Sequence, residues 1–511
     1  MQINYNRRTT KKVHIGTLTV GGEAPIRVQS MLNTSTNDTE ASVAQAIKVI
    51  EAGGEIVRLT TQGEREARNM AAIRSRLNEE GYAAVPLVAD VHFNPKAAFE
   101  AARHIEKVRI NPGNFAQTLE EADEKFTAFI KLCKEKGVAI RLGVNHGSLS
   151  KRIMERYGDT PEGMVESCME YLRICKRENF SNVVISVKAS NVRVMVHTVR
   201  LMAATIDAEG LNFPLHLGVT EAGNDFEGRI KSAVGIGTLL SDGIGDTIRV
   251  SLSEAPEREI PVAREIVRFI SERANAPQMP EADTSFINPY KYIRRTTDKI
   301  GVFGGGQVPE ILSASDTIPD GVIECNLTSG NALGEGRLFF AKLHAEKSTA
   351  PVVISRHYSR MSKEELIVRA SCELGPLFID GLGDGIRITA DGMEQNFIDD
   401  LMLTILQSAR ARMSKTEYIS CPSCGRTLFD IEGTISKIKA ATAGQSHLKI
   451  GIMGCIVNGP GEMADADYGY VGASPNHISL YKGQQVVRKN LPQDEAVEAL
   501  VQLIKDNGDW K

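Results

Sequence analysis

The sequence lacks a long apolar run, and its hydrophobic stretches are far too short to span a bilayer. Its first sixteen residues contain a few basic side chains but neither an apolar core nor a cleavage site, unlike a signal peptide. It also lacks a block of one charge, because acidic and basic residues are interspersed and the net charge is −4. We therefore expect a cytoplasmic protein that binds neither membranes nor nucleic acids.

Cysteine is scarce, with eight residues in 511. Cys133, Cys168 and Cys175 lie in helical patterns, while Cys325 and Cys372 stand alone. We interpret these five as buried, reduced thiols, which fits a reducing compartment.

The other three cysteines form a pattern typical of a metal centre. Cys421 and Cys424 form a CPSC pair, and Cys455 follows in GCIVNGPGE, but no fourth cysteine lies nearby. Thiolates favour zinc or iron–sulfur clusters. A cluster of four irons with three thiolates would leave one iron for a weaker ligand or for substrate, and Glu462 follows the Gly-Pro-Gly loop. The alternative is a structural zinc with His447 or His477 as fourth ligand.

Eight short apolar runs alternate with amphipathic helical patterns between Ile26 and Ser253. They are IRVQSM (from Ile26), IVRLTT (Ile56), PLVADVHF (Pro86), VRINPGN (Val108), AIRLGVN (Ala139), VVISVKAS (Val183), PLHLGVTEAG (Pro214) and DTIRVSLS (Asp246). Their spacing of roughly 30 residues is typical of parallel βα units. The sequence therefore predicts a (β/α)₈ TIM barrel with its active site at the C-terminal strand ends.

Positive charges lie inside these runs, where branched apolar residues are usual. The cations are Arg58, Arg109, Arg141, Lys188 and Arg249. Strand periodicity puts Asn111, Asn145 and Ser251 on the faces of three of them, and Asp90, His92, His146 and Glu221 lie near other strand ends. Buried ion pairs are the alternative, but they leave the cations in excess, and unpaired buried charge is costly. We therefore expect a phosphate or diphosphate ligand, which guanidinium groups bind in pairs of contacts.

The rest of the chain predicts two further domains. DGIGDTIRVS (Asp242–Ser251) recurs as DGLGDGIRIT (Asp380–Thr389), which indicates a partial, barrel-like α/β unit in the middle region. The C-terminal region alternates helices and strands around the cysteines. We expect a barrel over residues 1–272, an inserted spacer domain without catalytic residues over 273–392, and a small α/β domain over 393–511.

Several motifs resemble those of the 4-hydroxy-3-methylbut-2-enyl diphosphate synthase family. They are CPSCGRTLFDIE, GCIVNGPGEMADADYGYVG, INPGN, RLGVNHGSL, GVTEAG and GIGDTIRVSLS, and they cover the barrel and the cysteine domain. The middle region is similar to the form of this family that has an inserted domain.

This resemblance implies a site made by two domains. Cys421, Cys424 and Cys455 would bind a [4Fe–4S] cluster, with Glu462 on the fourth iron. The barrel would hold 2-C-methyl-D-erythritol 2,4-cyclodiphosphate through Arg58, Arg109, Asn111, Arg141, Asn145, Lys188, Arg249 and Ser251. Asp90, His92, His146 and Glu221 would lie near the carbon skeleton, with Glu221 a candidate proton donor. Ferredoxin or flavodoxin would supply electrons, to a monomer or homodimer whose C-terminal domain closes over its own barrel or its partner's.

Two other functions fit parts of the pattern. One is a binding protein that carries a zinc ribbon and recognises a phosphorylated ligand with its barrel. The other is a barrel aldolase in which Lys188 forms a Schiff base and the cysteine domain is structural.

Overall fold

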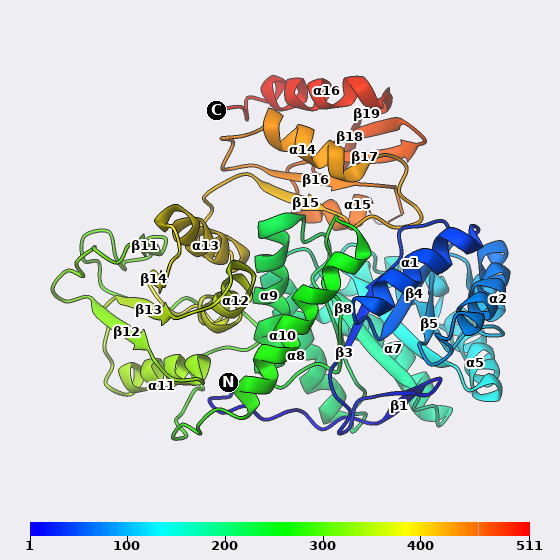
Figure 1. The fold of residues 1–511 in the computed structure, drawn as a ribbon, viewed down its shortest axis with the longest axis horizontal. Coiled ribbons are helices and arrows are strands. Elements are labelled where there is room, and N and C mark those ends of the chain that lie inside the picture. The colour runs from blue at the N-terminus through cyan, green and yellow to red at the C-terminus, as the bar shows by residue number, and fades with distance from the viewer. Residues whose placement is uncertain (458) are drawn as a thin grey trace.

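An eight-stranded parallel barrel forms the first half of the chain (Figure 1). The computed structural model describes residues 1–457 and 459–511, and of Pro460 and Glu462 it describes the backbone alone. The strand order is β8-β7-β6-β5-β4-β3-β10-β9, and a bridge between Ile185 and Leu215 joins the two ends. The strands are β3 (Arg27–Met31), β4 (Ile56–Thr61), β5 (Leu87–Val91), β6 (Lys107–Ile110), β7 (Ala139–Asn145), β8 (Val183–Lys188), β9 (His216–Leu217) and β10 (Thr247–Ile248). The predicted barrel is confirmed.

Helices follow every barrel strand and cover the outside of the barrel. They are α1 (Thr39–Glu51), α2 (Glu64–Glu79), α3 (Pro95–Ala101), α4 (Pro112–Phe115), α5 (Leu119–Lys136), α6 (Lys151–Tyr157), α7 (Pro161–Arg177), α8 (Val192–Ala208), α9 (Asp225–Ser241), η1 (Pro256–Arg258) and α10 (Glu259–Ala274). Local chemistry fixes several of their ends. The Thr118 side chain accepts the Glu121 N–H at the start of α5, and Gly137 ends that helix with a left-handed φ of 69°.

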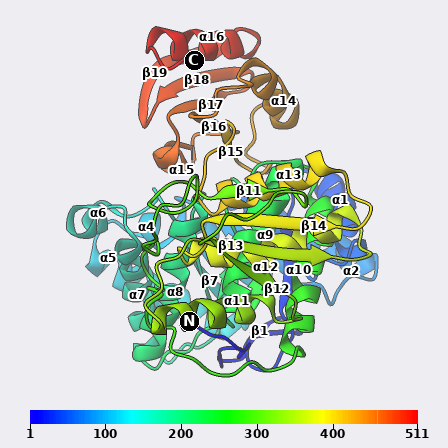
Figure 2. The ribbon, with the colours of Figure 1, turned by 90° about the vertical axis from the view of Figure 1, so that its left-hand side faces the viewer.

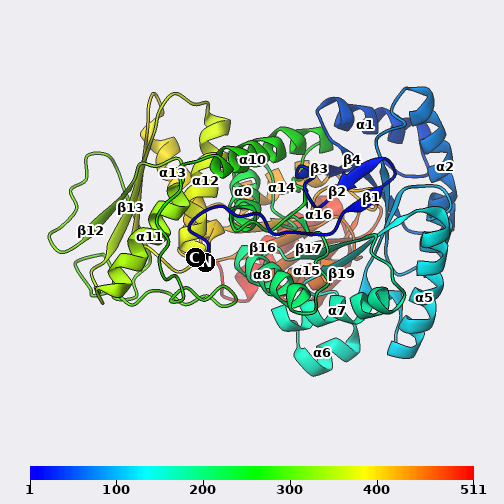
Figure 3. The same ribbon diagram turned by 90° about the horizontal axis from the view of Figure 1, so that it is seen from below.

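An N-terminal hairpin closes the lower end of the barrel (Figure 3). Its strands β1 (Val13–Ile15) and β2 (Leu18–Val20) pair antiparallel. Their buried side chains pack against apolar side chains at the start of the barrel strands, including Ile56 and Val88. A ligand must therefore enter from the opposite end, where the strands have their carboxyl termini.

The middle domain is half of a second barrel. Its four parallel strands are β11 (Glu310–Leu312), β12 (Ile323–Leu327), β13 (Val352–Tyr358) and β14 (Gly385–Ala390), and its helices are α11 (Ala332–Ala345), α12 (Lys363–Ile379) and α13 (Gln395–Ser408). The order β11-β14-β13-β12 repeats the order β3-β10-β9-β8 of the first barrel. The sheet lies on the outer side of the molecule with these helices behind it (Figure 2). The predicted barrel-like unit is thus present, as an open sheet.

Matching contacts show the equivalence of the two units. In the barrel, Asp246 accepts hydrogen bonds from the side chains of Arg7 and Thr10, both at 3.0 Å. In the middle domain, Asp384 accepts from Arg294 at 3.0 Å and from Thr297 at 3.1 Å. The sequence supports this match, because RRTT at residues 7–10 recurs at residues 294–297. The middle domain therefore repeats the N-terminal segment of the barrel as well as its last strands.

The two units face each other across equivalent helices, α9 and α12. A Cβ atom on Gly237 would lie 2.4 Å from Cys372 Sγ, and one on Gly375 would lie 2.8 Å from Val234 Cγ2. Gly237 and Gly375 hold the same position in the two repeats, as do Val234 and Cys372. The interface is therefore close to two-fold symmetric, and glycine on each side lets the helices approach closely.

Four buried charges complete the interface. Asp242 and Asp380 follow α9 and α12, and the arginines that pair with them lie in α8 and α11. Arg200 pairs with Asp242 at 2.8 Å and with Asp380 at 2.9 Å. Arg337 pairs with the same two carboxylates, each at 2.9 Å. Because each charge has two opposite partners, this cluster is balanced although it is almost fully buried.

The C-terminal domain is a five-stranded sheet covered by helices. Its elements are β15 (Glu417–Ser420), α14 (Ile431–Ala441), β16 (Lys449–Met453), α15 (Gly459–Glu462), η2 (Met463–Asp465), β17 (Tyr468–Ser474), β18 (His477–Lys482), β19 (Gln485–Pro492) and α16 (Gln493–Asp506). Its core is separate from the core shared by the barrel and the middle domain, to which α13 contributes. Within the described residues, no helix is long and apolar enough to traverse a membrane.

Candidate active site

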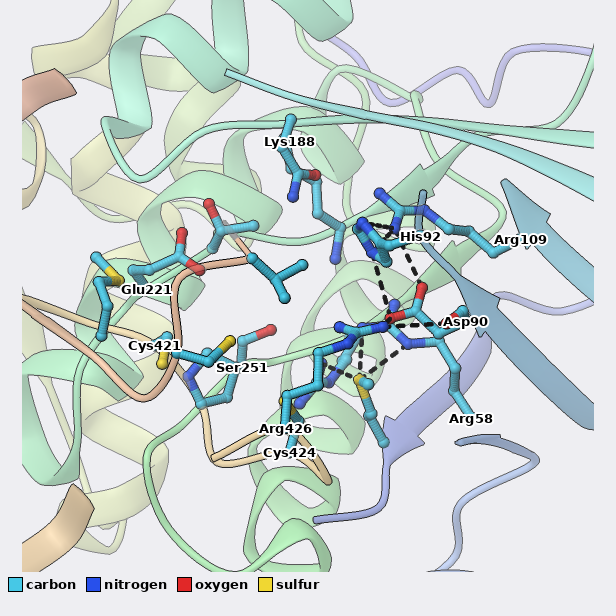
Figure 4. Close-up of a pocket in the computed structure, with 18 of the residues that line it drawn as sticks. Arg58, Asp90, His92, Arg109, Lys188, Glu221, Ser251, Cys421, Cys424 and Arg426 are labelled. Atoms are coloured by element: carbon cyan, nitrogen blue, oxygen red, sulfur yellow. Dashed lines mark hydrogen bonds and ion pairs between the residues drawn. The ribbon is translucent and has the colours of Figure 1, made fainter. Parts of the chain in front are cut away.

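A cavity lies between the barrel mouth and the C-terminal domain of the same chain. Its empty volume is about 700 Å³. The lining residues are Met31, Arg58, Asp90, His92, Arg109, Arg141, Asn145, Lys188, Thr220, Glu221, Arg249, Ser251, Cys421, Pro422, Cys424, Arg426, Met453, Cys455, Val457 and Gly459. All five predicted cations and all three predicted metal-binding cysteines are therefore brought together (Figure 4).

The charges on β5 and β6 form a compact network. Asp90 Oδ1 accepts from Arg109 Nη1 at 3.2 Å, and His92 lies beside both groups. Burial acts to raise the pKa of Asp90, but Arg58 and Arg109 outweigh it and hold that pKa well below its usual range. Burial, together with Arg109, lowers the pKa of His92 to about 3. At neutral pH, Asp90 is therefore an anion and His92 is neutral.

Arg141 and Lys188 are buried and form no ion pair with an acidic side chain among the described residues. Among the described residues, Arg141 Nε and Nη1 have no hydrogen-bond partner. Burial, followed by repulsion from neighbouring cations, lowers the pKa of both groups well below the ordinary values. A bound dianion would relieve both effects, because it supplies opposite charge and acceptors at once.

Arg249 differs, because it has an acidic partner inside the barrel. Its Nε and Nη2 donate to the two oxygens of Glu259 at 3.1 Å and 2.9 Å. Glu259 also accepts from Ser30 Oγ at 2.7 Å. This bidentate pair fixes the guanidinium plane beside Ser251 on the lining of the cavity.

Glu221 lies in the loop after β9 and has a left-handed backbone, with φ of 51°. It is 3% exposed. Left-handed backbone in a residue other than glycine is uncommon and often marks a functional position. The loop turns this carboxyl group toward the cysteine side of the cavity (Figure 4).

The three cysteines enter the cavity from two loops of the C-terminal domain. Cys421 and Cys424 follow β15, and Cys455 follows β16. Cys421 Sγ accepts the Gly454 N–H at 3.1 Å, a contact typical of a metal-bound thiolate. Among the described residues, no three His, Cys, Asp or Glu side chains converge closely enough for a single metal ion. The three cysteines line one cavity, and thiolates are donors that both zinc and iron–sulfur clusters accept.

The two histidines considered as zinc ligands lie elsewhere. His447 Nε2 contacts the Asp509 carbonyl oxygen at 2.8 Å, and His477 Nδ1 contacts that of Pro475 at 3.0 Å. Neither lines the cavity. The structure therefore places neither histidine beside the three cysteines.

Two of the predicted site residues that the structure describes, Asn111 and His146, do not line the cavity. The Asn111 side chain caps α4 and donates to Ser148 Oγ at 3.1 Å. His146 Nε2 lies 3.5 Å from Asp159 Oδ2. The side chain of Glu462 lies outside the described residues.

Arg426, Met31 and Thr220 line the cavity but were not predicted from the sequence. Arg426 reaches from the C-terminal domain to the barrel, where its Nη2 donates to the Asp90 carbonyl oxygen at 3.1 Å. In the sequence, only its position two residues after Cys424 indicates that Arg426 lies near the site.

Several contacts outside the cavity hold the two domains together. Lys231 of α9 pairs with Glu417 at 3.1 Å in a buried position. Lys439 of α14 pairs with Glu227 at 2.8 Å. Ser253 Oγ donates to the Cys421 carbonyl oxygen at 3.0 Å. One chain therefore contains a closed arrangement in which the C-terminal domain covers its own barrel.

Comparisons with known proteins agree with this architecture. The GcpE TIM-barrel domain matches residues 10–264, and the GcpE protein C-terminal domain matches residues 417–506. A 4-hydroxy-3-methylbut-2-en-1-yl diphosphate synthase (flavodoxin) from Parabacteroides distasonis is 48% identical over 611 positions, covering 99% of each chain. Proteins of that name from Bacteroides thetaiotaomicron and Akkermansia muciniphila are 47% and 42% identical, covering 99% of this chain and 98% and 97% of theirs.

Proposed function

This chain belongs to the 4-hydroxy-3-methylbut-2-en-1-yl diphosphate synthase (flavodoxin) family, and from that premise we propose how its residues share the reaction. The enzyme is an oxidoreductase of the methylerythritol phosphate route to isoprenoids. It opens the ring of 2-C-methyl-D-erythritol 2,4-cyclodiphosphate by reduction, and a hydroxyl group leaves as water. The observation that carries the proposal is the single cavity that joins the barrel cations to three cysteines.

In this proposal, the barrel binds the diphosphate. Arg141 and Lys188 form no ion pair among the described residues and lie on adjacent strands, so in this proposal they contact the phosphoryl oxygens. Arg58, Arg109 and Arg249 are held in place by their protein contacts and add positive charge around them. Holding the diphosphate firmly makes it a good leaving group at the carbon whose C–O bond breaks, and it stays attached to the product through its oxygen at the other carbon.

The residues around the carbon skeleton carry out acid–base catalysis and orient the substrate. Glu221 is a carboxyl group on the cysteine side of the cavity, and we propose it as the proton donor to the departing hydroxyl. His92 is neutral at physiological pH, and it orients Asp90 and Arg109 rather than carrying a charge. Asn145 and Ser251 line the cavity and supply neutral hydrogen bonds to the substrate.

We propose that Cys421, Cys424 and Cys455 hold a [4Fe–4S] cluster, with Glu462 as a replaceable fourth ligand. The donor set fits, since three thiols line one cavity and a backbone N–H already points at Cys421 Sγ. Such a cluster would supply electrons one at a time and a Lewis-acidic iron. The electron donor is flavodoxin, as the names of the relatives indicate for those proteins.

The test is iron and sulfide analysis of anaerobically purified protein, followed by turnover of 2-C-methyl-D-erythritol 2,4-cyclodiphosphate with reduced flavodoxin. We expect about four irons per chain and product formation. Cys455→Ser should lose most of the iron, whereas Cys133→Ser, a buried thiol in α5, is the matched control and should keep it. Zinc in place of iron, or equal iron loss in both variants, would contradict the proposal.

Glu462→Ala separates the fourth ligand from the other three. We expect it to retain a cluster, because three thiolates remain, but with greater lability and a sharp loss of turnover. Full turnover with an unchanged spectrum would mean that Glu462 does not bind iron.

A further inference from the structure

Arg426 is the charged side chain with which the C-terminal domain enters the barrel. Its Nη2 lies 3.1 Å from the carbonyl oxygen of Asp90 and 3.4 Å from Asp90 Oδ2. It is 8% exposed, and Figure 4 shows it directed toward Asp90 and Arg58. Asp90 Oδ1 pairs with Arg109, so one carboxylate is shared by a cation from each domain.

The backbone beside Arg426 is docked as closely as its side chain. A Cβ atom on Gly425 would lie 2.7 Å from the Thr34 carbonyl oxygen, in the loop that follows β3. Any larger residue would separate the two domains at this point. The CGR segment at residues 424–426 therefore places Arg426 inside the barrel mouth only when the domains are closed.

Arg426 also lies on the same cavity as the cysteines. It follows Cys424 by two residues in the chain, and both line that cavity together with Cys455. Among the described residues of the C-terminal domain that line the cavity, Arg426 is the one cation. It is thus a fixed positive charge next to the place where thiolates would be bound.

Charge explains why a cation is needed there. On the proposed function, the cavity receives a diphosphate and, from the other side, a cluster with three thiolates. Both carry negative charge, and each added electron increases it. A buried cation between them reduces this repulsion, and it stabilises the reduced form of the cluster more than the oxidised form.

We propose that Arg426 is a positioning residue that couples closure of the C-terminal domain to electron acceptance, by pairing with Asp90 and placing its charge beside the cysteines. This inference rests on the proposed function. It predicts that the domains close more firmly, and that the cluster is easier to reduce, when Arg426 is in place.

The test compares Arg426→Gln, Arg426→Lys and Lys439→Gln with the parent, all as anaerobic, iron-loaded protein. Lys439→Gln is the matched control, because it breaks another ion pair between the same domains, outside the cavity. The midpoint reduction potential is measured, together with hydrogen exchange of residues 421–430 with and without the cyclodiphosphate substrate.

We expect Arg426→Gln to lower the ratio of reduced to oxidised cluster about tenfold at a fixed potential, which is a shift of about 59 mV for one electron. The substrate should no longer protect residues 421–430 from exchange. Arg426→Lys keeps the charge and should recover most of the potential, even though the fork geometry is lost. Lys439→Gln should leave the potential unchanged.

Two results would overturn the inference. One is a parent-like potential and parent-like protection in Arg426→Gln. The other is an equal shift in Lys439→Gln, which would make the effect a general loss of domain contact. Absence of iron from the parent protein would instead overturn the proposed function, and this inference with it.

Discussion

Arg249 and Glu259 form a bidentate ion pair beneath the candidate active site, with Nη2–Oε1 and Nε–Oε2 distances of 2.9 Å and 3.1 Å. Both side chains are almost completely buried. Each therefore depends on the other for charge balance, and Arg249 has a structural role besides facing the cavity.

Arg249→Ala should consequently lower the free energy of unfolding as well as substrate affinity. Removal of one partner of a buried pair leaves an uncompensated charge and costs about 3–5 kcal/mol. The double variant Arg249→Ala/Glu259→Gln should recover part of this loss, because the orphaned charge is gone. Urea unfolding gives the free energy of unfolding of the single variant and of the double variant. Equal stability of Arg249→Ala and the parent would contradict the structural role.

Arg141→Ala should affect substrate binding with little effect on folding. Arg141 has no acidic partner among the described residues, and neighbouring cations repel it. We expect substrate affinity to fall by roughly 2–5 kcal/mol, while the free energy of unfolding changes by less than about 1 kcal/mol. Arg141→Lys should recover only part of the affinity, because one ammonium cannot make paired contacts. Calorimetric titration with the substrate tests the expected loss of affinity. Urea unfolding tests the expected small change in the free energy of unfolding.

Arg387→Ala should leave turnover within a few-fold of the parent. Arg387 is the repeat counterpart of Arg249, but it pairs with the partly exposed Glu324 at 2.9 Å on the outer sheet of the middle domain. Comparison of steady-state rates with those of the parent tests this. A loss of several hundred-fold in folded protein would reveal a second functional site.

Acid should destabilise the protein partly through His197. Burial lowers the pKa of this histidine in α8 to about 4, whereas an unfolded chain has a value near 6.5. Between these values, the unfolded state binds a proton that the folded state does not, so stability falls as the pH falls from about 6.5 to about 4.

His197→Gln should remove that contribution. The slope of unfolding free energy against pH should become smaller by about 1.4 kcal/mol per pH unit within that window. His14→Gln, at an exposed histidine, is the comparison variant. Urea midpoints at several pH values give the comparison, and an unchanged slope in His197→Gln would contradict the assignment.

The barrel and the cation set could be predicted because their signals are local. Each strand is a short apolar run, and Arg141 or Lys188 stands out within its own run. Thiols in a CxxC pair are equally visible. The half-barrel is only partly evident from the sequence. The repeat at Asp242 and Asp380 indicates it, whereas the short RRTT segments gain their meaning from the contacts with Asp246 and Asp384.

Other features depend on contacts between distant parts of the chain. Arg426 and Asp90 are 336 positions apart, so no window of sequence links them. Asn111 precedes Pro112, a pair typical of a helix start, and this local role accounts for its side chain in the structure. The alternation of strand residues gives a face of the barrel but not the loop geometry that decides which residues reach the cavity.

The matching of α9 with α12 affects how the molecule behaves on dilution. A contact between two separate chains weakens as protein concentration falls, whereas a contact between two parts of one chain has an effective concentration fixed by the linker. Gly237 and Gly375 hold the two repeats together within one chain. The face of the barrel formed by α9 is therefore occupied at every concentration, and its assembly with the middle domain needs no partner molecule.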